Sequence, residues 1–245
     1  LSKYCLDNTS VWVNYKPDDM MKEEIKRQGN KRPGLWMRNE KIFKREKIIY
    51  RKVAKYLIAT YDKGGLFYEQ TIHSVHITDK KIKTKYVLGI FNSSLLKFYY
   101  QKTNSQGGDI FPQVRISSVK NFPIKIVGNI TQKKIEVTVD YVLFLKKENR
   151  NSFFFESLID AMVHELYFPE EIKSAGAEIL KHLTDLPELK DDWSDEKKLE
   201  IIEKVYKEIS DPKHPASIAM EKQKMVPEVR IIEGLPALNE IEGDR

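Results

Sequence analysis

The sequence predicts an α+β fold, with strands in its first third and helices over most of the remainder. Three runs between residues 47 and 77 are rich in β-branched and aromatic residues, which favour strands. From Tyr86 onward the apolar residues recur every three or four positions, which is the period of an amphipathic helix. A third observation, the distribution of charge, divides the chain into two regions.

The net charge of +6 conceals two regions of opposite sign. Residues 1–126 hold 25 Lys and Arg against 11 Asp and Glu, a balance of +14, whereas residues 127–245 hold 17 against 25, a balance of −8. Because a solvated surface usually mixes the two signs, this asymmetry indicates two modules with different partners. We predict a polyanion-binding domain over 1–126 and a helical C-terminal region with an irregular tail over 127–245. The alternative is that the opposite charges hold the two regions together.

Composition excludes several classes of protein. Apolar residues make up 41% and charged residues 32%, which is typical of a globular and rather polar chain. No apolar run approaches the roughly 20 residues that span a bilayer, and the first residues contain no secretory signal, so no membrane partner is expected. Cys5 is the single cysteine, which fits a reducing cytoplasm. Since the chain starts with Leu1 rather than Met, we expect a piece of a longer protein.

The three predicted strands lie at 47–53, 56–60 and 71–77. The Asp-Lys-Gly-Gly turn at 62–65 predicts a hairpin that returns through 66–68. His73 and His76 would lie on opposite faces of the third strand, a poor arrangement for a metal, so no metal site is expected. The charged stretch 16–40, ahead of the strands, indicates a basic loop or short helix that faces solvent.

A single amphipathic helix is predicted over 84–101, because its apolar residues form one broad face. Leu95 and Phe98 lie on that face and are expected in the core. The polar tract 103–109, which contains two glycines, ends the helix.

Short and long helices follow. Ser117 is placed to cap a short helix over 118–121. One clean apolar stripe in the second half consists of Phe155, Leu158, Ile159, Met162, Val163 and Leu166. Pro169, followed by two glutamates, starts another helix, and Ser194 caps a third. Beyond Pro212 the periodicity is low, so an irregular packed tail is expected.

The motifs of common enzymes are absent from the sequence, including glycine-rich nucleotide loops, Cys-x-x-Cys and His-Glu-x-x-His. One alternative is a metal-dependent nuclease built on Asp18, Glu24 and Lys26, in which the carboxylates would hold Mg²⁺. That signature requires a strand carrying Glu24 and Lys26, whereas residues 20–27 are typical of a helix or loop. We therefore expect no catalytic residue in this chain.

Cations interleaved with aromatic and amide side chains in the basic region indicate nucleic-acid binding. Lys and Arg contact phosphates, and arginines and amides also read base edges in the major groove. The tract 103–109 is predicted to read bases, with the stretch 31–38 as a second contact; the alternative is an ordinary surface turn. The candidate DNA-binding residues are Lys31, Arg32, Trp36, Arg38, Arg45, Arg51, Lys52, Asn104, Gln106 and Arg115.

Three segments carry a resemblance to a known family. Residues 86–100, Tyr-Val-Leu-Gly-Ile-Phe-Asn-Ser-Ser-Leu-Leu-Lys-Phe-Tyr-Tyr, are similar to the Asn-Ser helix of target-recognition domains in adenine-specific DNA methyltransferases. The Phe-Pro and Phe-Pro-Ile elements of 111–124 resemble the end of such a domain, and 155–168 resembles a helix that follows it. Over roughly residues 1–185 the chain resembles the TaqI-like C-terminal specificity domain of type II restriction–modification enzymes that fuse cutting and methylation.

The resemblance implies sequence-specific recognition of double-stranded DNA, which positions a target adenine for flipping into the methyltransferase domain of the same polypeptide. The Asn/Asp-Pro-Pro-Tyr/Phe motif and the glycine-bearing S-adenosylmethionine loop of that domain do not occur in this sequence. The resemblance therefore implies a recognition fragment with no cofactor of its own, S-adenosylmethionine and Mg²⁺ being expected only in N-terminal catalytic domains. A non-catalytic specificity or assembly subunit is the remaining alternative.

Overall fold

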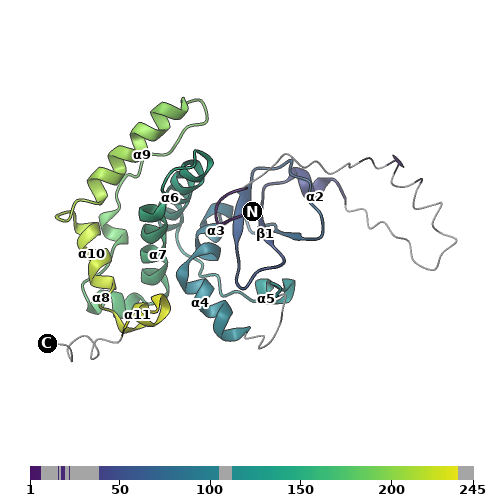
Figure 1. Cartoon of the computed structure of the whole chain (residues 1–245). Helices are drawn as coiled ribbons and strands as arrows, with labels where there is room; N and C mark the ends of the chain where they lie inside the picture. Colours follow the sequence, from purple (N-terminus) through teal and green to yellow (C-terminus); the bar gives the residue numbers. More distant parts are fainter. Residues whose placement is uncertain (7–15, 17, 20–21, 23–38, 105–111, 237–245) are drawn as a thin grey trace.

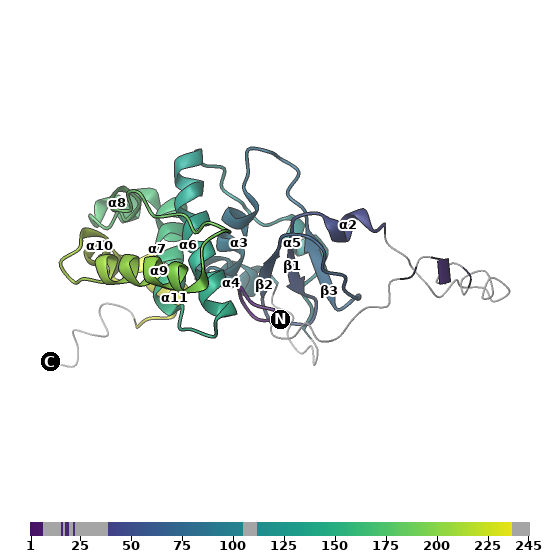
Figure 2. The same ribbon diagram turned by 90° about the horizontal axis from the view of Figure 1, so that it is seen from above.

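A computed structural model describes residues 1–6, 16, 18–19, 22, 39–104 and 112–236. A small antiparallel sheet lies on one side of the molecule and the later helices on the other (Figure 1). Seen from above, α2 (Lys41–Lys44) and β3 (Ile72–Val75) lie at one end of the molecule (Figure 2). The other end consists of α8 (Pro169–Ser174), α9 (Asp195–Ile209) and α10 (Pro215–Gln223) (Figure 2). With about 52% helix and 8% strand, the structure confirms the predicted α+β class.

The sheet has the strand order β2-β1-β3, formed by Ala59–Asp62, Lys47–Arg51 and Ile72–Val75. The three predicted strand regions are therefore confirmed. The central strand β1 pairs antiparallel with both neighbours, and its residues Ile48, Ile49 and Tyr50 are buried. Both faces of β1 are thus covered, as its run of apolar residues requires.

The predicted hairpin through 66–68 is wrong, because that segment pairs with no strand of the described chain. It returns instead to the short helix α2 (Lys41–Lys44), where Gly65 donates a hydrogen bond to the Phe43 carbonyl (2.9 Å). The Phe67 ring stacks on the Phe43 ring at 4.7 Å. Gly64 has φ +125° and lies so close to α2 that a Cβ would meet the Lys44 carbonyl oxygen at 2.5 Å, so the turn requires glycine.

The single helix predicted over 84–101 is also wrong, since the chain forms α3 (Thr84–Asn92) and α4 (Ser94–Thr103). Ser93 separates them in an extended conformation, with its hydroxyl donating to the Ile90 carbonyl (2.7 Å) and accepting from the Leu96 amide (3.2 Å). This N-cap starts a new helix and changes the direction of its apolar face. Consequently Leu96 and Tyr100 are buried, whereas the predicted core residues Leu95 and Phe98 are only partly buried.

Helix α3 packs closely against the long helices α6 (Asn129–Lys147) and α7 (Phe153–Tyr167). At Gly89 the approach is so tight that a Cβ would lie 2.7 Å from Ile135 Cγ2 and 3.3 Å from Val139 Cγ2. One cluster of buried side chains therefore extends from the sheet through α3 into α6 and α7. The division into domains at residue 126 stays a prediction.

The second half confirms several local predictions. All residues of the predicted apolar stripe are buried on α7, Pro169 begins α8 (Pro169–Ser174), and Ser194 caps α9 (Asp195–Ile209) through its hydroxyl. The short helix predicted over 118–121 is present as α5 (Ile116–Lys120). The capping role predicted for Ser117 is wrong, because the helix begins earlier and its N-cap is Arg115.

The irregular tail predicted beyond Pro212 is wrong in its first part. The chain forms α10 (Pro215–Gln223) and α11 (Pro227–Glu233), each with its proline at the first helical position. Proline is favoured there, because the first amide of a helix has no intrahelical partner, so these prolines start helices rather than interrupt them. Across the described residues, no helix combines the length and the apolar character needed to cross a membrane.

Candidate nucleic-acid interface

The structure places half of the predicted DNA-binding residues. Those outside the described residues are Lys31, Arg32, Trp36, Arg38 and Gln106; those described are Arg45, Arg51, Lys52, Asn104 and Arg115. Of the alternative nuclease residues, Asp18 is exposed, and Glu24 and Lys26 lie outside the described residues. No group of His, Cys, Asp and Glu side chains in the described ranges is arranged to hold a metal.

Two distant segments meet just beyond the end of β1. Val53 forms an antiparallel bridge with Gln113, flanked by hydrogen bonds from the Ala54 amide to the Pro112 carbonyl (3.0 Å) and from the Val114 amide to the Lys52 carbonyl (2.7 Å). This pairing brings the cations at the end of β1 to the segment that leads into α5. We call the side chains of Arg51, Lys52, Gln113 and Arg115 the bridge cluster.

Helix α4 holds the backbone of the bridge cluster through Tyr100. The buried Tyr100 donates a hydrogen bond from its hydroxyl to the Gln113 carbonyl (3.1 Å). Burial raises the pKa of Tyr100, and the charge of Arg115 acts in the opposite direction. Tyr100 therefore stays a neutral hydrogen-bond donor, and it fixes the backbone from which the bridge cluster projects.

Gln113 is the residue that sequence reasoning missed. Its side chain is exposed, while its carbonyl accepts from Tyr100 and its two neighbours, Pro112 and Val114, are hydrogen-bonded to the segment after β1. A glutamine amide pairs bidentately with adenine in a major groove, and a fixed backbone lowers the entropy lost on binding. The available signal was its place in the Phe-Pro-Gln-Val-Arg stretch, beside a cation, rather than any property of a lone glutamine.

Two cations of the bridge cluster, Arg51 and Lys52, are open to a ligand. Arg51 is exposed and Lys52 partly exposed, and within the described chain neither forms an ion pair. Val53 and Ile116 beside them are 41% and 46% exposed. Exposed cations suit phosphates, and exposed apolar side chains suit a thymine methyl group or sugars.

Arg45 lies at the other end of β1, roughly 20 Å from Arg51 at the rise of an extended strand. Its backbone is held by the buried Lys47, whose ammonium group donates to the carbonyls of Phe43 (2.5 Å) and Arg45 (3.2 Å). Lys47 also forms a buried ion pair with Asp62, its ladder partner on β2. The structure therefore does not bring Arg45 to the bridge cluster.

Asn104 lies at the end of α4, and its side-chain amide forms hydrogen bonds within the protein. The Nδ2 group donates to the Tyr100 carbonyl (3.3 Å) and to Thr103 Oγ1 (2.9 Å), while Oδ1 accepts from Ser118 Oγ (2.6 Å). These contacts join the end of α4 to α5, which follows the bridge cluster. Base reading by Asn104 stays a prediction, and it would require these hydrogen bonds to exchange.

The sequence profile of the TaqI-like C-terminal specificity domain matches residues 1–124, half of the chain. The chain belongs to this family. No match was found among curated proteins or among solved structures. Membership assigns the chain to DNA sequence recognition in a restriction–modification context, and the whole bridge cluster lies within the matched residues.

In this TaqI-like specificity domain the Asn-Ser pair has a structural role. The Asn92 amide pairs with the backbone of Ala59 on β2, accepting from its N–H (3.1 Å) and donating to its carbonyl (2.9 Å). The next residue but one, Ser94, donates its backbone N–H to Asp160 on α7 (2.8 Å) and lies 3.2 Å from His164 Nε2. The motif therefore joins the sheet, the α3–α4 break and α7, which makes a rigid support for the bridge cluster.

Proposed function

We propose that the chain reads the sequence of duplex DNA through the bridge cluster. One observation carries the proposal, namely an exposed glutamine whose backbone is held by a β-bridge and which lies beside cations. Arg51, Lys52 and Arg115 would contact phosphates and set the register, while Gln113 would contact a base edge. Arg45 would contact the same duplex further along its backbone.

We further propose that the recognised site contains an adenine that is methylated at N6. The resemblance of residues 86–124 to target-recognition domains of adenine-specific methyltransferases supports this step. In this proposal the chain binds and orients DNA in the cytoplasm, and a methyltransferase domain of the same polypeptide holds S-adenosylmethionine and flips the adenine. The chain's own residues contribute binding and positioning only.

Selection of duplexes from a random library with the 245-residue chain tests the recognition step. We expect one enriched motif. Gln113→Ala should relax the preference at one base position by about 1–3 kcal/mol, while Lys52→Ala should weaken binding to all sequences alike. Lys120→Ala, which removes an exposed cation from the far end of α5, is the matched control and should change neither. Enrichment of no motif, or a motif unaltered by Gln113→Ala, would contradict the assignment.

The adenine step has its own test. The motif enriched by the chain should coincide with a site of N6-methyladenine in the DNA of the source organism, which single-molecule sequencing detects. A motif whose adenines are all unmethylated would refute the methyltransferase association and leave DNA recognition intact.

A further inference from the structure

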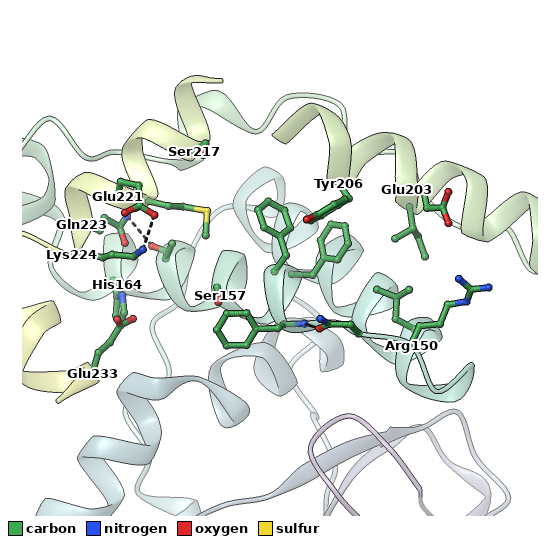
Figure 3. A pocket seen from close by; sticks show the side chains of 18 of the residues that line it. Arg150, Ser157, His164, Glu203, Tyr206, Ser217, Glu221, Gln223, Lys224 and Glu233 are labelled. Atoms are coloured by element: carbon green, nitrogen blue, oxygen red, sulfur yellow. Dashed lines mark hydrogen bonds and ion pairs between the residues drawn. The ribbon is translucent and has the colours of Figure 1, made fainter. Parts of the chain in front are cut away.

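A groove lies in the acidic region, between α7, α9 and α10, with a volume of about 770 Å³ (Figure 3). Its lining is mainly apolar and aromatic, and the principal side chains are Phe153, Phe154, Phe155, Ile202, Tyr206 and Met220. No residue of the bridge cluster lines it. DNA recognition therefore does not account for this groove.

Aromatic side chains form both the floor and the rim of the groove. The Phe154 ring meets the rings of Phe155 and Tyr206 edge-on, at 5.3 and 5.1 Å between centroids, which fixes the floor. On the rim, Phe153 is 74% exposed and Tyr206 46% exposed. Exposed aromatic residues beside an apolar groove are typical of protein interfaces.

The helices α7 and α9 that border the groove are long enough to hold a docked helix. Helix α9 packs on the rest of the protein through Ile202, Val205 and Ile209, which are buried. Its residues Leu199, Ile202, Glu203 and Tyr206 line the groove opposite α7. Both α7 and α9 have 15 residues, a length of about 22 Å. An added helix of three to four turns would pack its apolar side chains between them, as in other helix-in-groove interfaces.

Charge at the groove selects a basic occupant. Glu203 and Arg150 lie toward one end and Glu233 toward the other (Figure 3). Glu221 is paired with Lys224 at 2.6 Å, whereas Glu203 and Glu233 form no ion pair within the described chain. Among the described residues that line the groove, these two carboxylates outnumber Arg150, which also forms no ion pair there. The region as a whole, with 17 basic and 25 acidic residues, has a balance of −8.

We propose that this groove docks a basic amphipathic helix of a partner protein. The apolar face of that helix would cover Phe153 and Tyr206, and its flanking Lys or Arg side chains would pair with Glu203 and Glu233. Because the bridge cluster does not line the groove, the docking proposal and the DNA-recognition proposal can be tested, and refuted, separately.

Peptide binding to the full 245-residue chain, measured by fluorescence anisotropy, tests the proposal. The probe is a helical peptide of about 18 residues, with Leu and Phe on one face and Lys on its flanks. One control peptide replaces each Lys by Glu, and a second scrambles the sequence to remove the apolar face. We expect the basic peptide to bind at least about tenfold more tightly than either control. Equal binding of the basic and acidic peptides, or no binding, would overturn the proposal.

Variants of the chain place the peptide in the groove. Phe153→Ser should weaken binding about tenfold, whereas Ile130→Ser, which alters an isoleucine that is 76% exposed on α6, should have no effect. Glu203→Lys should weaken binding of the basic peptide and strengthen binding of the acidic one. Glu208→Lys, elsewhere on α9, is the matched control for this variant. Equal effects of a variant and its control would contradict the assignment. So would a dimer of the chain that Phe153→Ser dissociates in sedimentation, because the occupant would then be a second copy.

Discussion

Around Gln113 the basic region exposes an amide and several cations on a backbone fixed by hydrogen bonds, whereas around Phe153 the acidic region exposes aromatic rings above an apolar groove. The first surface suits a hydrated polyanion, which is recognised by directional polar contacts. The second suits a partner that buries apolar area. The opposite charges of the two regions therefore accompany two different kinds of surface chemistry.

These two surfaces rest on one continuous core. Gly89 on α3 lies against Ile135 and Val139 on α6, and Asn92 and Ser94 join the sheet to α7. The regions thus differ at the surface and not in the packing beneath it. Changes in the core should affect both regions together, while changes at either surface should affect one.

The largest expected effect concerns the charge pair buried in the basic region. Lys47→Ala leaves Asp62 buried without its partner and should lower the free energy of unfolding by about 3–5 kcal/mol. Lys44→Ala is the matched control, because Lys44 pairs with Glu40 at the surface and such pairs contribute at most about 1 kcal/mol. Chemical denaturation measures both. Equal small losses would mean that water replaces the ammonium group of Lys47.

The next largest expected effect is the loss of stability caused by a substitution in the core that the two regions share. Ile135→Ala should cost about 2–5 kcal/mol, because Ile135 is fully buried against α3, whereas Ile130→Ala on the same helix should change stability by at most about 0.5 kcal/mol. Hydrogen exchange should become faster in β1 as well as in α6. Unchanged exchange in β1 would show that the two regions unfold separately.

The junction of the regions predicts an unusual pH dependence. Burial raises the pKa of Asp160 to about 6, opposed by Ser94 and Lys3, so this carboxyl stabilises the fold increasingly as pH falls from about 6 to 4. Burial lowers the pKa of His164 to about 4, so this imidazole destabilises the fold over nearly the same range as pH falls. The two contributions oppose each other in the wild-type protein.

Asp160→Asn should therefore make the protein more sensitive to acid. Between pH 6 and 4 its stability should fall by about 1.4 kcal/mol more per pH unit than that of the wild type. His164→Gln should have the opposite effect and make the protein more stable as pH falls. Thermal unfolding across this range measures both. Parallel pH profiles for Asp160→Asn and the wild type would refute the assignment of the raised pKa to Asp160.

The smallest expected effect is on the salt dependence of DNA binding, which distinguishes the two surfaces. Removing one phosphate contact with Arg51→Ala should reduce the slope of log K against log salt by about 0.9. Lys207→Ala, which removes an exposed cation from α9 in the acidic region, should leave that slope unchanged. A change with Lys207→Ala as large as with Arg51→Ala would mean that DNA binding is not confined to the basic region.

Much of this molecule follows from local sequence. The β-branched runs form the strands, the apolar stripe of 155–166 is the buried face of α7, and Ser194 caps α9. The family was recognisable from the segments around Asn92 and Phe122, because a short motif can be identified in the sequence without knowing which residues it contacts. Each of these features depends on neighbours within a few residues.

Tertiary structure decided the rest. The break at Ser93 could not be predicted from an uninterrupted apolar period, because Asn92 and Ser94 hold it through partners on β2 and α7. Gln113 became a candidate only when it bridged to Val53, far away in the sequence. Residue type and spacing determine which local structures are stable, but the positions that face a ligand depend on contacts between distant segments, which no local pattern contains.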